Sequence, residues 1–335
     1  MSTFIEQANK TMEIELKQAL SAQDFISSGS FCDAINGRRF DFMLSADGHG
    51  TSFCIDILRE LHRENKIEEY LTVENPMIKL GAFINFHYTL KKSGFCCVIV
   101  KIYQPIGKEP GIVKSWCVGD SQSAIIKNSE LVYISCPHNL TNPSEVERLK
   151  EIRHLIQPCD SVPKISTKTS VIPRKAEYIN FIGSNSVIAM SQALGHNGVT
   201  GLAPEYYEHI FTDNDKIRVV IGSDGFWEQH IFDGPCQEDV DEDLRDLTTM
   251  SAKQLIDKME ARWKQSWKYY WIPGNTKKFV ETDYPEDGID DINVGVWSFD
   301  IVPFDQQDFD EKANKIFEEY QMQKEEESIV TSVEL

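Results

Sequence analysis

The sequence has little positive charge and no long apolar run. Its 335 residues contain 34 Lys and Arg against 53 Asp and Glu, which gives a net charge of -19. Sequence-independent binding to nucleic acid depends on Lys and Arg that neutralise phosphates, so this balance argues against a nucleic-acid partner. An anionic membrane surface is equally unfavourable. Because no stretch of about 18 apolar residues occurs, we predict no membrane-spanning helix.

Paired cysteines are also lacking. The eight cysteines form no C-x-x-C pair and no zinc-type spacing with histidine. The adjacent Cys96 and Cys97 lie in an apolar run, which is typical of buried free thiols. The first 20 residues contain no apolar signal core. These absences predict a soluble protein of a reducing compartment, the cytoplasm or alternatively the nucleus.

Short β-rich runs alternate with amphipathic helical runs along the chain. We predict strands at residues 40–45, 96–103, 114–118, 124–127 and 131–135. The last three are so close together that we expect hairpins in an antiparallel sheet. Helices are predicted at residues 52–65, from Asn142 to Ile156, and from Ser251 to Trp267. The acidic residues 238–246 are predicted to be a solvated loop.

No internal repeat or low-complexity linker divides the chain. We therefore predict a single domain of mixed helices and strands at residues 23–303. A helical N-terminal extension is expected at residues 1–22. Residues 304–335 are expected to form a charged helix, at 305–326, and a frayed tail.

Three segments place an aspartate at the end of an apolar strand, beside residues that permit tight turns. They are ADGHG at residues 46–50, GSDGFW at 222–227 and GIDDINV at 288–294. Any one Asp-Gly pair after a strand is usually only a turn. Their recurrence, together with the turn Gly119-Asp120-Ser121, indicates a site where carboxylates meet. Such a site, without zinc-type ligands, favours hard cations such as Mg²⁺ or Mn²⁺.

The order of the motifs ADGHG, VGDS, IAMSQALG, GSDGFWE and DDINV resembles the type 2C, metal-dependent protein serine/threonine phosphatases. The patterns of that family are FDGHGG, VGDSR, AVSRALGD, SDGLWD and DNxTV. Residues 137–148 also look like the family's DHKP…NPEERERI segment, and the resemblance runs from about Ser27 to Phe299. It implies an α+β fold, a four-layer α-β-β-α sandwich with two antiparallel sheets flanked by helices and a metal cleft at one edge.

The resemblance also implies roles for particular residues. The expected ligands of two ions, Mg²⁺ or Mn²⁺, are Asp47, the Gly48 carbonyl, Asp224 and Asp290. Asp47 is expected to bridge the two ions, which together activate a water molecule. His49 is expected to protonate the departing serine or threonine oxygen. Asp120 and Glu228 are expected to support the ligands or a weaker third ion.

This chain departs from the family in its first motif, R-x-x-M-E-D. The best match is at residues 28–34, where Asp33 is the aspartate, Cys32 replaces the glutamate and Ser28 replaces the phosphate-binding arginine. Asp33 is therefore expected near the metals, and the second ion is expected to be weakened because a thiol replaces a carboxylate poorly on Mg²⁺. Arg38 or Arg39 is a candidate replacement for the arginine, although we favour solvated turn residues for both.

Two further segments differ from the family or vary within it. His196 stands where the aspartate closes the ALGD stretch, and we interpret it as structural. Residues 156–182 fall where the family carries a variable flap. The basic side chains of this flap are candidates for contact with phosphoproteins, namely Lys164, Lys168, Arg174 and Lys175.

The leading hypothesis is a monomeric hydrolase of phosphoserine and phosphothreonine in phosphoprotein substrates. The first alternative is a pseudophosphatase that binds protein partners with weak or no catalysis, because the first motif has lost its arginine and glutamate. The second alternative is another metal-dependent phosphoesterase such as a nuclease, against which the net charge argues.

Overall fold

The computed structural model describes residues 8–19, 21–86, 92–152, 156–157, 166–167, 179–182, 187–230, 237–271, 278–283 and 289–301. The chain divides into two compact units, one of Lys10–Phe299 and the other joining residues 1–9 and 300–335. The helix predicted at 305–326 and the flap residues Lys164, Lys168, Arg174 and Lys175 lie outside the described residues. Within the described part, no helix is long and apolar enough to cross a membrane.

One sheet of the larger unit has six strands in the order β13-β5-β4-β3-β2, with β12 paired to β4. Their bounds are β2 (Asp24–Cys32), β3 (Arg39–Gly50), β4 (Ser93–Tyr103), β5 (Gly111–Val118), β12 (Leu194–Gly195) and β13 (Glu205–Phe211). Neighbours in this sheet pair antiparallel. The hairpin of β2 and β3 turns through residues 33–38, where Gly37 takes a φ of +70°, a left-handed conformation that glycine adopts readily.

The second sheet has five strands in the order β1-β17-β14-β6-β7. They are β1 (Ala8–Lys17), β6 (Gln122–Lys127), β7 (Glu130–Ile134), β14 (Ile217–Gly222) and β17 (Ile292–Ile301). Two smaller sheets have the orders β11-β10-β8 and β16-β15-β9. Their strands are β8 (Ile156–Gln157), β9 (Ser166–Thr167), β10 (Ile179–Phe181), β11 (Val187–Ile188), β15 (Ser266–Trp271) and β16 (Lys278–Asp283).

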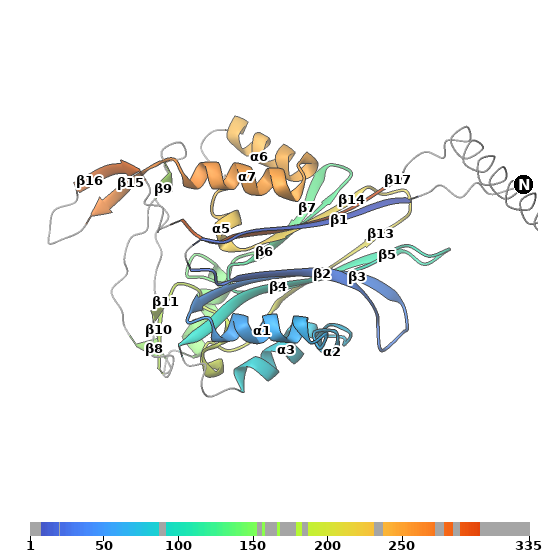
Figure 1. Ribbon diagram of the computed structural model, residues 1–335, viewed down its shortest axis with the longest axis horizontal. Coiled ribbons are helices and arrows are strands. Elements are labelled where there is room, and N and C mark those ends of the chain that lie inside the picture. The colour runs from blue at the N-terminus through green and yellow to red at the C-terminus, as the bar shows by residue number, and fades with distance from the viewer. Residues whose placement is uncertain are drawn as a thin grey trace, which may run out of the picture. The chain divides into compact units, whose positions relative to one another are not determined.

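Helices cover the outer face of each large sheet (Figure 1). On the six-stranded sheet lie α1 (Phe53–Arg63), α2 (Glu68–Leu71) and α3 (Pro76–Asn85), and on the five-stranded sheet α5 (Asp224–Trp227), α6 (Gln237–Thr249) and α7 (Ala252–Trp263). The helix α4 (Pro143–Glu151) and the 3₁₀ turn η3 (His196–Gly198) complete the described set. One apolar cluster fills the space between the sheets, and one lies under each helix layer. The predicted four-layer α-β-β-α sandwich is confirmed.

The five predicted strands all form, but one of the two expected hairpins is wrong. β6 and β7 do pair antiparallel. β5, in contrast, pairs with β4 and β13 in one sheet, while β6 pairs with β14 and β7 in the other. The short link Gly119-Asp120-Ser121 therefore carries the chain from one sheet to the other. Loop length alone could not distinguish this crossing from a hairpin.

Helix ends and the acidic segment also differ from expectation. α4 ends at Glu151, so Ile156 belongs to β8, and α7 ends at Trp263, so Trp267 belongs to β15. The segment 238–246 is not a solvated loop but part of α6, because Val240 and Leu247 recur on one buried face among the acidic residues.

The expected N-terminal helix is a strand instead. Residues 8–17 form β1 at the edge of the five-stranded sheet. Met12, Ile14 and Leu16 alternate with polar residues, which is the period of a strand and not of a helix. The free thiols of Cys96 and Cys97 are buried, as predicted.

The core between the sheets gives a stability prediction. Phe211 is fully buried there, while its neighbour Ile210 is 56% exposed. We expect Phe211→Ala to lower the free energy of unfolding by about 3–5 kcal/mol because it leaves a cavity. Ile210→Ala, the matched control, should change it by less than about 0.5 kcal/mol. Urea denaturation of the two variants checks this, and equal effects would contradict the placement of Phe211.

Candidate metal centre

Two aspartates face each other where β2 begins. Asp24 is the first residue of β2 and pairs with Asp47 on β3, while Asp47 pairs on its other side with Cys96 on β4. Residues opposite each other on neighbouring strands project from the same face of the sheet. Both aspartates are buried. The strand register therefore brings two carboxylates and a thiol together at one end of the six-stranded sheet.

Further carboxylates reach this point from the other sheet. Asp224 follows β14 as the first residue of α5, and Asp290 precedes β17. The side chains of Asp47 and Asp224 share a hydrogen bond, and the charge of Asp290 also acts on Asp47. Gly225 makes this approach possible, because a Cβ at that position would clash with the carbonyl of Asp291. The predicted trio of Asp47, Asp224 and Asp290 does converge.

Asp120 joins the cluster from the link between the sheets. The charge of Asp224, and then that of Glu228, acts on Asp120. Glu228 follows α5, with its amide donating to the Asp224 carbonyl at 2.7 Å. Both of these sequence-predicted residues therefore lie beside Asp224.

The electrostatics of the cluster call for a cation. Burial, reinforced by the charges of Asp224, Asp24 and Asp290, raises the pKa of Asp47 well above its ordinary value. Burial and the neighbouring Asp291 raise the pKa of Asp24 to about 8, and burial and Asp224 raise the pKa of Asp120 to about 7. One oxygen each of Asp120 and Asp224 is buried without a hydrogen-bond partner among the described residues. Carboxylates in this state fit a hard divalent cation, which would neutralise them.

A thiol belongs to the same cluster. The ligand atoms of Asp47, Cys96 and Asp120 lie within 4.8 Å of one another. Gly119 allows this contact, since a Cβ there would overlap the Cys96 sulfur, and its φ is +89°. Cys96 is thus a neighbour of the carboxylates that its place in an apolar run did not reveal.

The adjacent Asp290 and Asp291 have different partners. Asp291 accepts hydrogen bonds from the Ala19 amide, from the Ser21 hydroxyl at 2.7 Å and from the Gln23 amide at 2.7 Å. It thereby fixes the segment that leads into Asp24. The charge of Asp290, in contrast, helps to raise the pKa of Asp47.

Side chains of α7 hold the turn that carries Asp224. The Trp263 indole donates to the Gly225 carbonyl at 2.7 Å, and Arg262 donates to the Gln229 carbonyl at 2.6 Å. Arg262 is itself fixed by the fully buried Asp243 of α6, at 2.6 and 2.9 Å. The turn from Asp224 to Gln229 is therefore anchored at both ends.

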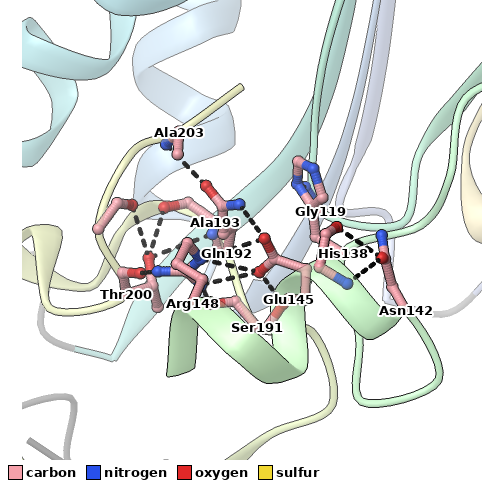
Figure 2. Close-up of polar contacts among 12 residues, drawn as sticks. Gly119, His138, Asn142, Glu145, Arg148, Ser191, Gln192, Ala193, Thr200 and Ala203 are labelled. Atoms are coloured by element: carbon pink, nitrogen blue, oxygen red, sulfur yellow. Dashed lines mark hydrogen bonds and ion pairs between the residues drawn. The ribbon is translucent and has the colours of Figure 1, made fainter. Parts of the chain in front are cut away.

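A buried polar network holds the Asp120 link and a second segment (Figure 2). His138 accepts from the Gly119 amide at 3.1 Å and donates its own amide to the Gly119 carbonyl at 2.8 Å. Glu145, only 4% exposed, accepts from Arg148 at 2.8 Å, from Gln192 at 2.7 Å and from Ser191. The network therefore joins α4 to the segment that begins at Ser191.

His49 pairs with a second histidine. Its Nδ1 lies 2.9 Å from Nε2 of His196, and the two rings are almost parallel with centroids 4.8 Å apart. Burial, followed by the neighbouring His196, lowers the pKa of His49 to about 3. His49 is two residues from Asp47 on β3, so both side chains project from the same face of the strand.

The Ser28–Asp33 segment does not reach this centre, which corrects the predicted first motif. Cys32 pairs with Arg39 at the turn end of the hairpin, whereas Asp24 pairs with Asp47 at the opposite end. Asp33 accepts from the Tyr103 hydroxyl at 2.5 Å and from the Ile35 amide at 2.8 Å. Ser28 lies midway along β2, opposite Met43. Asp33 fits the first motif in sequence, but the register of the hairpin places Asp24, and not Asp33, beside Asp47.

The two arginines proposed as phosphate ligands also lie at the turn end. Arg38 donates to the carbonyls of Gln104, at 2.5 Å, and Pro110, at 2.7 Å. Arg39 is exposed on β3 opposite Cys32. Neither lies at the end of the hairpin that holds Asp47. Arg39 is exposed, as the favoured interpretation of solvated turn residues expects, whereas Arg38 is held by backbone carbonyls.

Asp24 is the residue that the sequence interpretation missed, and a signal for it exists. Gly37 marks the hairpin loop between β2 and β3, and strands that leave a loop pair at equal distances from its centre. The loop is centred between Ile35 and Asn36, so Cys32 pairs with Arg39, and eight residues further along each strand Asp24 lies opposite Asp47.

Comparison with known proteins finds likeness in structure only. No protein-family model matches the sequence, and no curated protein matches it. Among solved structures, the serine/threonine phosphatase PstP/Ppp of Mycobacterium tuberculosis is 15% identical, with a TM-score of 0.46 over 86% of this chain and 97% of that one. The catalytic domain of phosphatase PstP in complex with two manganese ions is 13% identical, with a TM-score of 0.45 over 88% and 99%.

The PP2C phosphatase domain, with part of the regulatory domain, of SpoIIE from Bacillus subtilis is similar to a comparable extent. It is 12% identical, with a TM-score of 0.45 over 89% of this chain and 65% of that one. At these levels the likeness carries no argument about chemistry. The case for function rests on the side chains.

The raised carboxyl pKa values predict how stability varies with pH without metal. A carboxyl whose pKa is raised by folding binds more protons in the folded state than in the unfolded state. The free energy of unfolding therefore falls as the pH rises from the pKa in the unfolded state, about 3.9, through the raised pKa in the folded state. Between about pH 5 and pH 8 we expect a fall of more than about 1.4 kcal/mol, the equivalent of one pKa unit. Denaturation in EDTA at several pH values measures it.

Asp24→Asn should flatten this pH dependence, because it removes one of the raised carboxyls. The control is Asp215→Asn: burial acts to raise the pKa of Asp215, but hydrogen bonds from Thr212 and Lys127 lower it to about 2. Its titration lies below the range, so the slope should be unchanged. If the free energy of unfolding of the wild type does not change with pH, the carboxyls of the cluster do not repel one another.

Proposed function

We propose that the chain is a metal-dependent phosphatase of phosphoserine and phosphothreonine in proteins, of the type 2C family. The observation that carries the proposal is the convergence of Asp224 and Asp290 on the buried Asp47, from three motifs far apart in sequence. These motifs occur in the order that the family shows.

The residues present fit a pair of divalent cations, Mg²⁺ or Mn²⁺. Asp47 would hold both ions, with the Gly48 carbonyl on one and Asp224 and Asp290 on the other. Asp24, which faces Asp47 across the hairpin, would take the role that the family resemblance gives to Asp33. Bound metal would supply Lewis-acid stabilisation of the phosphoryl oxygens and a water of lowered pKa.

His49 is the proposed proton donor to the leaving oxygen. Serine and threonine leave as poor alkoxides, so a proton delivered as the P–O bond breaks lowers the barrier. His49 is neutral in the buried site, and a bound phosphoryl dianion would favour its imidazolium form. Once that proton has moved to the leaving oxygen, solvent restores it.

A pseudophosphatase is the second candidate, and one observation favours it. With Asp24 as the first-motif aspartate, the residue before it is Gln23, where the family has glutamate. The Gln23 amide nitrogen donates to the Gly50 carbonyl at 3.2 Å. A neutral amide holds a cation more weakly than a carboxylate, so binding without efficient turnover is the specific alternative.

Metal binding and turnover together test the proposal. We expect the wild type to bind Mn²⁺ in calorimetry and to release phosphate from a phosphoserine peptide. Asp47→Asn and Asp224→Asn should each weaken Mn²⁺ binding by more than the roughly 10–100-fold typical of groups that only support a metal ligand. Phosphate release should fall with it.

Asp33→Asn is the matched control, because Asp33 lies at the turn end of the hairpin and should leave Mn²⁺ affinity unchanged. Mn²⁺ binding without hydrolysis would select the pseudophosphatase. Hydrolysis of DNA or RNA that Asp47→Asn abolishes would select a nuclease. Absence of any Mn²⁺ binding would exclude both metal-dependent enzymes and leave the pseudophosphatase.

A further inference from the structure

His196 is built into the fold as a partner for His49. Gly94 of β4 pairs with His49 of β3 on one side and with Gly195 of β12 on the other. The residue after Gly195 is His196, so the two histidines reach each other across a single strand. A Cβ at Gly94 would lie 2.5 Å from the His196 ring and 2.7 Å from Cε1 of His49. Glycine at this position therefore makes room for both rings.

The backbone around His196 is strained to place its ring. Gly195 has a φ of +95°, and His196 and Asn197 have φ of 47° and 55°. Two consecutive non-glycine residues in the left-handed region are uncommon, and such strain persists only where the surroundings impose it. His196 is nonetheless fully buried. Strain at a buried residue beside a proposed catalytic group indicates a functional constraint.

The surrounding network imposes that conformation. Arg148 donates to the carbonyls of Ser191, at 2.8 Å, and Thr200, at 3.0 Å, which lie on either side of His196 in sequence. The Gln192 side chain accepts from the Ala203 amide at 2.7 Å. The segment 191–203 is thus tied at both ends to α4 and to itself (Figure 2). His196 sits on a rigid loop.

We propose that His196 is the positioning residue for His49, an inference that rests on the proposed phosphatase function. Its Nε2 holds Nδ1 of His49 at 2.9 Å. The other nitrogen of His49, Nε2, is buried with no hydrogen-bond partner among the described residues. Fixing Nδ1 leaves Nε2 as the nitrogen that gives its proton to the leaving oxygen.

An imidazole is suited to this task because it can either donate or accept. While His49 is neutral with its proton on Nε2, His196 donates to Nδ1. When His49 is an imidazolium, or has given up the Nε2 proton, His49 carries a proton on Nδ1 and His196 accepts it. The bond between the rings therefore persists through the proton transfer. A carboxylate in the same place would only accept.

The test compares two leaving groups. His196→Ala removes the partner, whereas His196→Gln keeps an amide that can donate or accept at similar reach. We expect His196→Ala to lose about 10- to 100-fold in kcat on a phosphoserine peptide, less than the roughly 10²–10⁴-fold that proton transfer contributes, because His49 itself remains. On p-nitrophenyl phosphate, whose phenolate leaves without a proton, it should lose less than about 3-fold. His196→Gln should restore most of the loss on the peptide.

An equal loss on both substrates, or no loss on the peptide, would overturn the inference. Mn²⁺ affinity of each variant, measured by calorimetry, should match the wild type, because His196 acts through His49 and not through the metal ligands. A weakened Mn²⁺ affinity in His196→Ala would also count against it, as the sign of a general structural role.

A second measurement stays informative if the wild type hydrolyses neither substrate, which would defeat the proposed function alone. Nitrogen-15 NMR of the imidazoles distinguishes a protonated from a bare ring nitrogen. We expect the Nδ1 shift of His49 to show a hydrogen bond in the wild type and in His196→Gln, and to lose this signature in His196→Ala. Identical His49 nitrogen shifts in all three proteins would show that His196 does not orient it.

Discussion

Acidic side chains that gather where little water reaches them repel one another, and the structure depends on how this repulsion is neutralised. Asp24, Asp47, Asp120, Asp224 and Asp290 come from both sheets and from the link between them. Their ionised forms are compatible with burial only if a cation neutralises them. Without it, part of the set keeps its protons. The proposed metal binding would therefore be coupled to the closing of the sandwich edge, since the same contacts would serve both.

Much of the fold was predictable because its signals are local. Strands such as β4 are largely apolar runs, and the segments that carry Asp47 and Asp224 stand directly after such runs, the first of them as the end of β3 itself. The crossing at Asp120 was not predictable from loop length, because a short link suits a hairpin and a change of sheet equally. β1 was predictable in principle, since its alternating Met12, Ile14 and Leu16 carry the strand period.

Site residues could be predicted from the sequence only where they belong to a recognisable motif. Asp47, Asp224 and Asp290 follow from motifs, whereas Asp24 follows from hairpin register and needs the turn to be located first. The residues that hold these aspartates in place show no local pattern in the sequence. Trp263 reaches Gly225, and His138 reaches Gly119, across stretches of chain whose folding brings them together. Only the packed structure reveals such partners.

Because β1 pairs with β17, the five-stranded sheet cannot be completed until late in translation. The ribosome releases the first strand of the five-stranded sheet long before the last one, and these two are neighbours. Asp290 arrives immediately ahead of that last strand. Nascent chains can thus build the six-stranded layer during translation, but the cluster of acids stays incomplete until almost the whole larger unit has emerged. A truncated or stalled product would expose a sheet edge without its partner.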